Sequence, residues 1–154
     1  MIHQESHIFD DTIRNNLNME LVQTDETLLK CMEFVDLQEF KLDQNICEDG
    51  SNLSGGQVQR IGIARTIAHL KEVLLWDEIT ASLDAQTAIE IENRILDLKE
   101  ETVLYVTHKY LDETLKKFDC ILVFKQGRIV EQGSFEELMK NKGDFFSLKN
   151  KGCI

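Results

Sequence analysis

Residues 53–84 read LSGGQVQRIGIARTIAHLKEVLLWDEITASLD, and this stretch decides the fold of the 154-residue chain. A glycine pair precedes a helical pattern, and an apolar run then leads into two adjacent acids. The first part predicts a helix from about Gly55 to Leu70, because apolar residues recur on one broad face. The second part predicts a strand ahead of Asp77, and four consecutive apolar residues are typical of a parallel strand buried on both faces.

The start of the predicted helix has the features of a phosphate-binding site. Ser54 is a favourable N-cap, and Gln57 follows three residues later, as a capping box requires. Gly55 and Gly56 leave the first turn bare, so that an anion can approach the backbone closely. The first N–H groups of a helix are unpaired and its dipole is positive there, which attracts phosphate. An ordinary capped helix is the alternative for Ser-Gly-Gly alone, and the acids downstream favour the phosphate site.

The acidic pair follows the apolar run Val73–Trp76. Two buried acids without partners would be costly, so we expect them at the carboxyl end of the strand, where α/β folds bind ligands. Asp77 could hold Mg²⁺ directly or through water, because hard cations prefer oxygen ligands. Glu78 could polarise a water for attack on a phosphoryl group. The alternative is a strand followed by an acidic loop.

Together these residues resemble the nucleotide-binding domain of ATP-binding cassette (ABC) transporters. Leu53–Gln57 match the signature motif of that family, Val73–Glu78 match its Walker B motif, and Ser82–Asp84 look like its D-loop. His108, after the apolar run Val103–Val106, looks like its switch histidine. The order and the spacing of the motifs agree along nearly the whole chain, which makes the match specific.

The resemblance implies a role for each candidate site residue. Gln4 precedes an Ile-Phe and a Thr-Ile-Arg-Asn-Asn pattern, and so resembles the Q-loop glutamine that reaches the metal and the attacking water in ABC exporters. Glu78, His108 and Gln4 are then the candidate catalytic residues, and Asp77 and Gln4 the candidate metal ligands. The candidate nucleotide-binding residues are Ser54, Gly55, Gly56, Gln57 and Asp84. The implied cofactors are ATP and Mg²⁺.

The implied fold class is α/β, with a P-loop NTPase-like parallel sheet that lacks its N-terminal strands and a small helical subdomain. Residues 9–70 would form the helical subdomain with the signature motif, and residues 71–154 the C-terminal part of the ATPase core. None of the eight glycines precedes a lysine, so these residues contain no Gly-x-x-x-x-Gly-Lys-Ser/Thr phosphate loop. The resemblance therefore covers the cassette from the Q-loop onward.

The resemblance also places a strand between two strands that this sequence predicts, at Thr102–Thr107 and Ile121–Phe124. In the family that strand leads into the phosphate loop. Without it, both neighbours would carry unpaired backbone edges, which recruit other chains. We therefore expect the isolated chain to be marginally stable and to self-associate, or Ile121–Phe124 to pair directly with the His108 strand.

The implied partners are a second nucleotide-binding domain, in a head-to-tail dimer, and the transmembrane domain of an exporter. The implied location is the cytoplasmic face of the cell membrane, and no apolar run here approaches the ~20 residues that span a bilayer. The net charge is −11, and in residues 1–52 twelve acids outnumber three basic residues. This balance argues against a nucleic-acid partner.

Two other functions remain open. The chain could be a non-catalytic interaction module whose signature helix completes the ATP site of a partner cassette. It could also belong to the ABC-type ATPases of DNA repair, but it shows no sustained heptads for their coiled coils, and its acidity disfavours DNA. A phosphate loop encoded upstream in the same reading frame would separate the exporter ATPase from the interaction module.

Further elements follow from local patterns. Residues 24–37 have a helical apolar face that Thr24 or Asp25 could cap, and Asp84 suits the N-cap of another helix. Arg60 and Arg65 are long enough to reach charged partners, with surface salt bridges as the alternative. The C-terminal part predicts a hairpin around Gln126-Gly127 and a capping box of Ser134 with Glu137.

Overall fold

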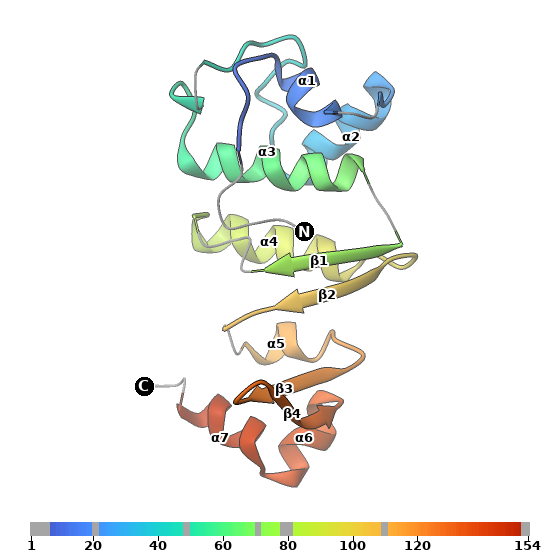
Figure 1. The fold of residues 1–154 in the computed structure, drawn as a ribbon, viewed down its shortest axis with the longest axis vertical. Helices are drawn as coiled ribbons and strands as arrows, with labels where there is room; N and C mark the ends of the chain where they lie inside the picture. The colour runs from blue at the N-terminus through green and yellow to red at the C-terminus, as the bar shows by residue number, and fades with distance from the viewer. Residues whose placement is uncertain are drawn as a thin grey trace. The chain divides into compact units, whose positions relative to one another are not determined.

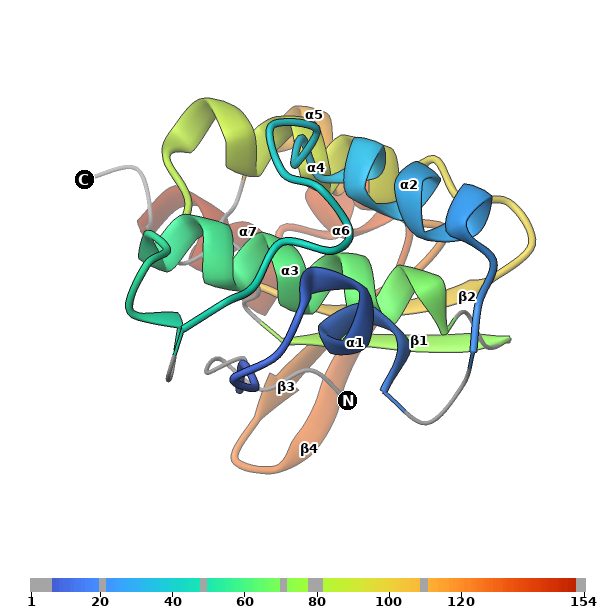
Figure 2. The same ribbon diagram turned by 90° about the horizontal axis from the view of Figure 1, so that it is seen from above.

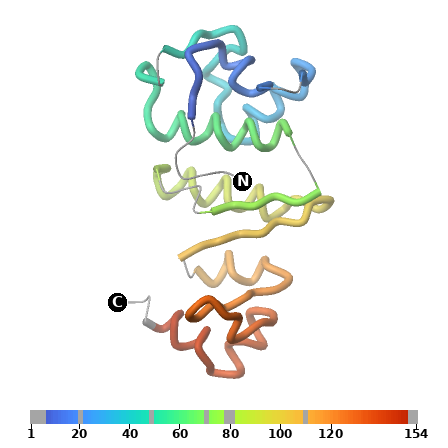
Figure 3. Tube along the Cα trace, in the orientation of Figure 1, coloured from blue at the N-terminus to red at the C-terminus, as the bar shows by residue number. Residues whose placement is uncertain are grey.

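The computed structural model describes residues 7–19, 22–47, 50–69, 72–77, 82–108 and 111–151. Gln4 and Glu78 lie outside these ranges. The chain divides into two compact units, Met1–Val106 (unit 1) and Thr107–Ile154 (unit 2), which can be followed along the traces in Figures 1 and 3. No helix among the described residues is long and apolar enough to span a bilayer.

Unit 1 combines four helices of the described chain with a two-stranded parallel sheet. They are α1 (Ile13–Asn18), α2 (Asp25–Phe34), α3 (Gly55–Ala68), β1 (Val73–Asp77), α4 (Ala85–Leu96) and β2 (Thr102–Val106). Figure 1 shows α3 with α1 and α2 on one side and α4 and β1 on the other. Seen from above in Figure 2, α3 runs alongside β1. The predicted signature helix and the two predicted strands are therefore confirmed, within two residues at their ends.

The N-terminal helices begin at hydroxyl caps. Thr12 accepts a hydrogen bond from the backbone N–H of Asn15 and starts α1. Thr24 accepts from the N–H of Thr27 and starts α2, so Thr24 is the cap and Asp25 the first helical residue. Each cap satisfies one of the backbone donors that a helix start leaves unpaired.

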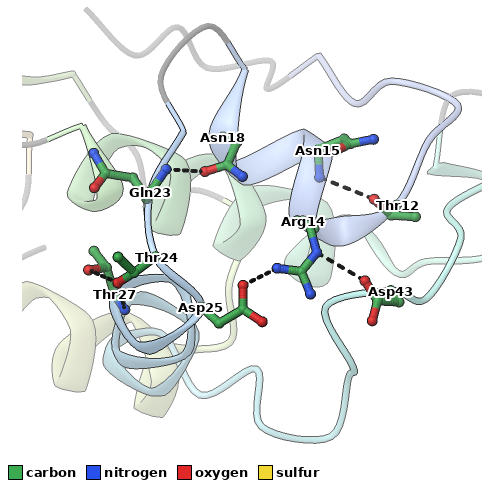
Figure 4. A network of polar contacts seen from close by, with 9 residues as sticks. All are labelled: Thr12, Arg14, Asn15, Asn18, Gln23, Thr24, Asp25, Thr27 and Asp43. Atoms are coloured by element: carbon green, nitrogen blue, oxygen red, sulfur yellow. Dashed lines mark hydrogen bonds and ion pairs between the residues drawn. The ribbon is translucent and has the colours of Figure 1, made fainter.

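Arg14 ties three segments of the acidic N-terminal region together (Figure 4). Its Nε donates to Asp43 Oδ1 at 3.0 Å, and its Nη1 donates to Asp25 at the start of α2. The hydrogen bonds to Asp25 and Asp43 raise the pKa of the Arg14 guanidinium above its usual value. Arg14 thus neutralises part of the negative charge that this region concentrates.

The core of unit 1 is one apolar cluster shared by its helices and by β1. Its largest fully buried side chains are Ile13, Leu17, Leu28, Met32, Leu37, Ile46, Ile61, Ile63, Trp76, Ile91 and Ile95. Burying each such side chain contributes about 1.5–3 kcal/mol. This shared core fixes α3 and α4 against β1, and so positions the loops at the ends of these elements.

One face of the parallel sheet is buried, and the other face is largely exposed among the described residues. Leu74 and Trp76 point into the core, and Val103 on β2 packs against the same cluster. On the other face, the exposed fractions are 56% for Val73 and 51% for Leu104. The prediction of a strand buried on both faces is therefore wrong, because Val73 is exposed and Leu75 is only half-buried on this second face.

In the described part of unit 2, three short helices pack with an antiparallel hairpin. Its elements are α5 (Asp112–Leu115), β3 (Ile121–Lys125), β4 (Arg128–Gly133), α6 (Phe135–Asn141) and α7 (Asp144–Lys151). Its core consists of Leu115, Val123, Phe135, Leu138 and Phe145. The strand β3 pairs with β4, and among the described strands it does not pair with β2. The direct pairing considered as an alternative is therefore not formed.

The local predictions for unit 2 are confirmed. The hairpin turns at Gln126 and Gly127, whose φ angles of 51° and 75° are the positive values that a two-residue type I′ turn requires. Ser134 caps α6, and its side chain and that of Glu137 form both bonds of a capping box. Turn residues and caps act over three or four positions, which is why the sequence predicts them.

Candidate functional site: the start of α3 and the loop before α4

The start of α3 is closed by the predicted capping box. The N–H of Ser54 donates to Gln57 Oε1 at 2.9 Å, and the N–H of Gln57 donates to Ser54 Oγ at 3.2 Å. The oxygen of Ser54 is occupied as an acceptor, but its hydroxyl hydrogen can still donate to an anion. The capping box therefore fixes the first turn through the N–H groups of Ser54 and Gln57, and leaves those of Gly55 and Gly56 for a ligand.

The glycine pair keeps this turn open to a ligand. A Cβ atom on Gly55 would meet nothing within 4 Å. No acceptor among the described residues takes the N–H of Gly55 or Gly56. Two unpaired donors at the positive end of a 14-residue helix suit the oxygens of a phosphate. The donor set at this turn thus fits part of a nucleotide phosphate.

The loop before α4 lies against the same turn. A Cβ atom on Gly56 would stand 3.5 Å from the carbonyl oxygen of Ser82 and 3.6 Å from Leu83 Cδ2. Asp84 caps α4 as predicted, because its Oδ1 accepts from the N–H of Thr87 at 3.0 Å. That hydrogen bond lowers the pKa of the Asp84 carboxyl. The structure therefore brings the signature residues and the Asp84 loop together.

The parallel strands end side by side, at the end of unit 1 where α3 begins (Figure 1). Asp77, the last residue of β1, is exposed and lies in register with Val106, the last residue of β2. His108 follows β2 by two residues and is exposed. The predicted catalytic residues Glu78 and Gln4 lie outside the described residues.

One carboxylate at this edge fits a partial magnesium site. No three His, Cys, Asp or Glu side chains gather as a metal site within the described ranges. Mg²⁺ is commonly bound through one or two carboxylates, with phosphate oxygens and waters completing its octahedron. Asp77 is able to supply one such ligand, and the remaining ligands must come from elsewhere.

Sequence reasoning missed the role of Arg65, whose side chain forms no salt bridge with any residue that the structure describes. Its Nε donates to the carbonyl oxygen of Asn16 at 2.6 Å, its Nη1 to that of His7 at 2.9 Å, and its Nη2 to Asn16 Oδ1 at 3.2 Å. The guanidinium also stands 5.6 Å from the ring centroid of Phe9, and burial lowers its pKa. The spacing of the residues could have indicated this role. Arg65 follows the buried Ile61 by four positions, and so lies on the same face of the helix.

Arg60 also binds backbone. Its Nη1 donates to the carbonyl oxygens of Val35 and Asp36, and its Nη2 stands 3.6 Å from Glu39. Arg60 and Arg65 thus connect α3 to the segments before and after α2. Their bonds hold the helix that carries the signature residues within unit 1.

These features define an α/β protein with a glycine-rich helix start beside the carboxyl ends of parallel strands. The family model described as ABC transporter matches residues 1–81. The chain belongs to the ABC transporter family.

Several curated relatives also belong to the ABC transporters. The chain is 34% identical to an uncharacterized ABC transporter ATP-binding protein of Haemophilus influenzae, over 94% of this chain and 27% of that protein. It is 36% identical to the ATP-dependent lipid A-core flippase of Vibrio vulnificus, over 96% of this chain and 27% of the flippase. It is 35% identical to a beta-(1→2)glucan export ATP-binding/permease protein of Bartonella bacilliformis, over 99% of this chain and 27% of that protein. The chain thus spans about a quarter of the length of these relatives.

A solved structure shares the fold. The chain superposes on a bacterial Atm1-family ABC exporter with ATP bound, with a TM-score of 0.86 and 28% identity. The match covers 99% of this chain and 28% of the exporter chain. The predicted fold class is therefore confirmed, as a small parallel sheet with helices that matches the fold of an ABC exporter.

Proposed function

We propose that this chain supplies the C-terminal part of the ATP-hydrolysing domain of an ABC exporter, which couples ATP binding and hydrolysis to transport across a membrane. The observation that carries the proposal is the start of α3, where Gly55 and Gly56 offer N–H groups that no described residue accepts to a phosphate next to the Asp84 loop. The similarity to export proteins and to an exporter structure with ATP bound supports it. Residues 9–70 would be the helical part and residues 71–154 the core part.

Each site residue has a proposed task. Ser54, Gly55, Gly56 and Gln57, together with Asp84, bind the ATP held by the opposite cassette of a head-to-tail dimer. Asp77 would hold Mg²⁺, which neutralises charge on the phosphates when it is bound. Glu78 accepts the proton of the attacking water as a general base. Gln4 and His108 orient this water and the γ-phosphate.

The proposed assembly includes other polypeptide segments. The transmembrane domain of an exporter is the partner to which ATP hydrolysis is coupled, and the cassette lies at the cytoplasmic face of the membrane. A segment with a phosphate loop must hold the β- and γ-phosphates, because these 154 residues contain no such motif.

A non-catalytic role is the second candidate. The start of α3 is complete in this chain, whereas the phosphate-loop motif is not among its residues. A module of this kind would complete the ATP site of a partner cassette without turnover of its own. Changing Glu78 separates the two roles, because only the catalytic role depends on its carboxylate.

We expect the isolated chain to bind Mg-ATP weakly and not to hydrolyse it. Two N–H groups and one hydroxyl at α3 cannot replace a backbone cradle and a lysine around the β- and γ-phosphates. Isothermal titration calorimetry of the purified chain with Mg-ATP should show no saturation in the micromolar range. Micromolar binding would contradict the proposed dependence on a phosphate-loop segment.

We also expect the isolated chain to self-associate. The largely exposed face of the parallel sheet carries Val73 and Leu104, and each of its strands has one edge without a described partner strand. Such surfaces recruit further strands. Light scattering should detect oligomers that Leu104→Lys reduces, because a charge on an exposed strand opposes pairing. Val22→Lys is the matched control, since Val22 is 93% exposed and lies outside the sheet. A monodisperse wild-type monomer with a concentration-independent melt would contradict this expectation.

A further inference from the structure

Gln59 is a buried polar residue for which the proposed mechanism has no task. Only 6% of its surface is exposed, although it lies in the second turn of α3, near the exposed start of the helix. A buried amide is costly unless it is hydrogen-bonded. Its location therefore calls for a specific partner.

That partner is the loop before α4. Gln59 Oε1 accepts a hydrogen bond from the backbone N–H of Ser82 at 3.0 Å, across 23 positions of sequence. Gly56 lies three residues before Gln59, and therefore on the same side of α3. It faces the same loop, with its Cβ position 3.5 Å from the Ser82 carbonyl oxygen. The Ser82 segment is thus held by a hydrogen bond at its N–H, and its carbonyl oxygen lies beside Gly56.

The two segments joined in this way are the two that carry nucleotide-binding candidates. Ser54 and Gly55 belong to the first turn of α3, and Asp84 comes two residues after Ser82. If they shifted independently, the donors at the helix start and the Asp84 loop would each have to be ordered when ATP binds. A fixed connection removes that cost, because the groups are already oriented.

We propose that Gln59 is a positioning residue, whose side chain fastens the Ser82–Asp84 loop to the first turns of α3 so that both approach ATP as one unit. The catalytic consequence of this role rests on the proposed function. The connection between Gln59 and the Ser82–Asp84 loop does not depend on that function. In this proposal Gln59, which is buried, has no contact of its own with ATP or the attacking water. It acts through Ser82 and the helix start.

The connection is tested by hydrogen exchange at the Ser82 amide in the 154-residue chain. Gln59→Met keeps the length and volume of the side chain but removes the acceptor, and should speed exchange at Ser82 about tenfold, the effect of losing one hydrogen bond. Gln59→Glu keeps an acceptor oxygen at the same place and should retain the protection. Gln38→Met, at an exposed glutamine, is the matched control. Unchanged exchange at Ser82 in Gln59→Met would overturn the proposal.

The catalytic consequence is tested in the ATPase assembly that includes a phosphate-loop segment. Gln59→Met should lower kcat by ~10–10²-fold, the order of loss expected when reacting groups are misplaced by about 1 Å, and Gln59→Glu should restore it. Ile91→Val, a conservative change in the core of α4, should lower the melting temperature but keep kcat. Equal kcat in the Gln59→Met and wild-type assemblies would overturn the positioning role. A wild-type assembly without hydrolysis would overturn the proposed function instead, and the exchange at Ser82 would still decide whether Gln59 holds the loop.

Discussion

Replacing Glu78 with glutamine should slow ATP turnover of the complete cassette by ~10²–10⁴-fold, the range typical of losing a general base. The amide has nearly the shape of the carboxylate but cannot accept the proton of the attacking water. Binding of ATP should remain, because the phosphate contacts proposed for Ser54 and Gly55 do not involve Glu78. Steady-state hydrolysis and ATP affinity, measured on the same preparation, check both halves of this expectation.

The matched control is Glu72→Gln. Glu72 is exposed and immediately precedes β1, so it lies at the end of the strand opposite to Asp77. The same chemical change there should leave turnover within a factor of about two, because surface substitutions away from a site are nearly neutral. Near-normal turnover of Glu78→Gln would remove Glu78 from the role of base. It would favour the non-catalytic module.

The second large effect is expected on stability, from Asn16→Ala. Asn16 is fully buried, and its Oδ1 accepts from the N–H of Phe9 at 2.9 Å and from Arg65 Nη2 at 3.2 Å. Its Nδ2 donates to the carbonyl oxygens of Phe9 and Thr12. Alanine leaves several of these groups unpaired, one of them on a charged side chain. The free energy of unfolding should fall by ~2–4 kcal/mol.

Urea unfolding followed by the fluorescence of the single tryptophan, Trp76, measures this loss, because Trp76 lies in the core of unit 1. Asn15→Ala is the control, an identical change at the exposed neighbouring residue, and should cost less than ~0.5 kcal/mol. If both variants unfolded at the wild-type urea concentration, the Asn16 cluster would not be what holds the N-terminal segment to α3.

The sequence predicted well the features that depend on neighbours along the chain. The capping box of Ser54 with Gln57 and the start of α4 at Asp84 follow from residue types three or four positions apart, and both are present in the structure. The same local logic located Gly55 and Gly56 in the first turn of α3. The functional roles of these residues remain predictions.

Features that depend on distant residues could not be predicted in this way. The partner of Arg65, Asn16, is 49 positions away, and that of Gln59, Ser82, is 23 positions away. Periodicity identifies the face of a helix but not the segment that packs against it. The exposed Val73 has a similar cause, because an apolar run shows that a strand suits burial and not whether neighbouring segments cover it.

The most direct measurement is ATP hydrolysis by this chain together with a segment that carries the phosphate loop, compared with hydrolysis by each component alone. The proposed function predicts Mg²⁺-dependent hydrolysis only when both are present. Changing Ser54 to alanine and Glu78 to glutamine in this chain should each reduce it, because one residue contacts the phosphates and the other activates water. Hydrolysis by the chain alone, or hydrolysis by the pair that neither substitution reduces, would contradict the proposal that this chain supplies the signature and catalytic residues of an ABC ATPase.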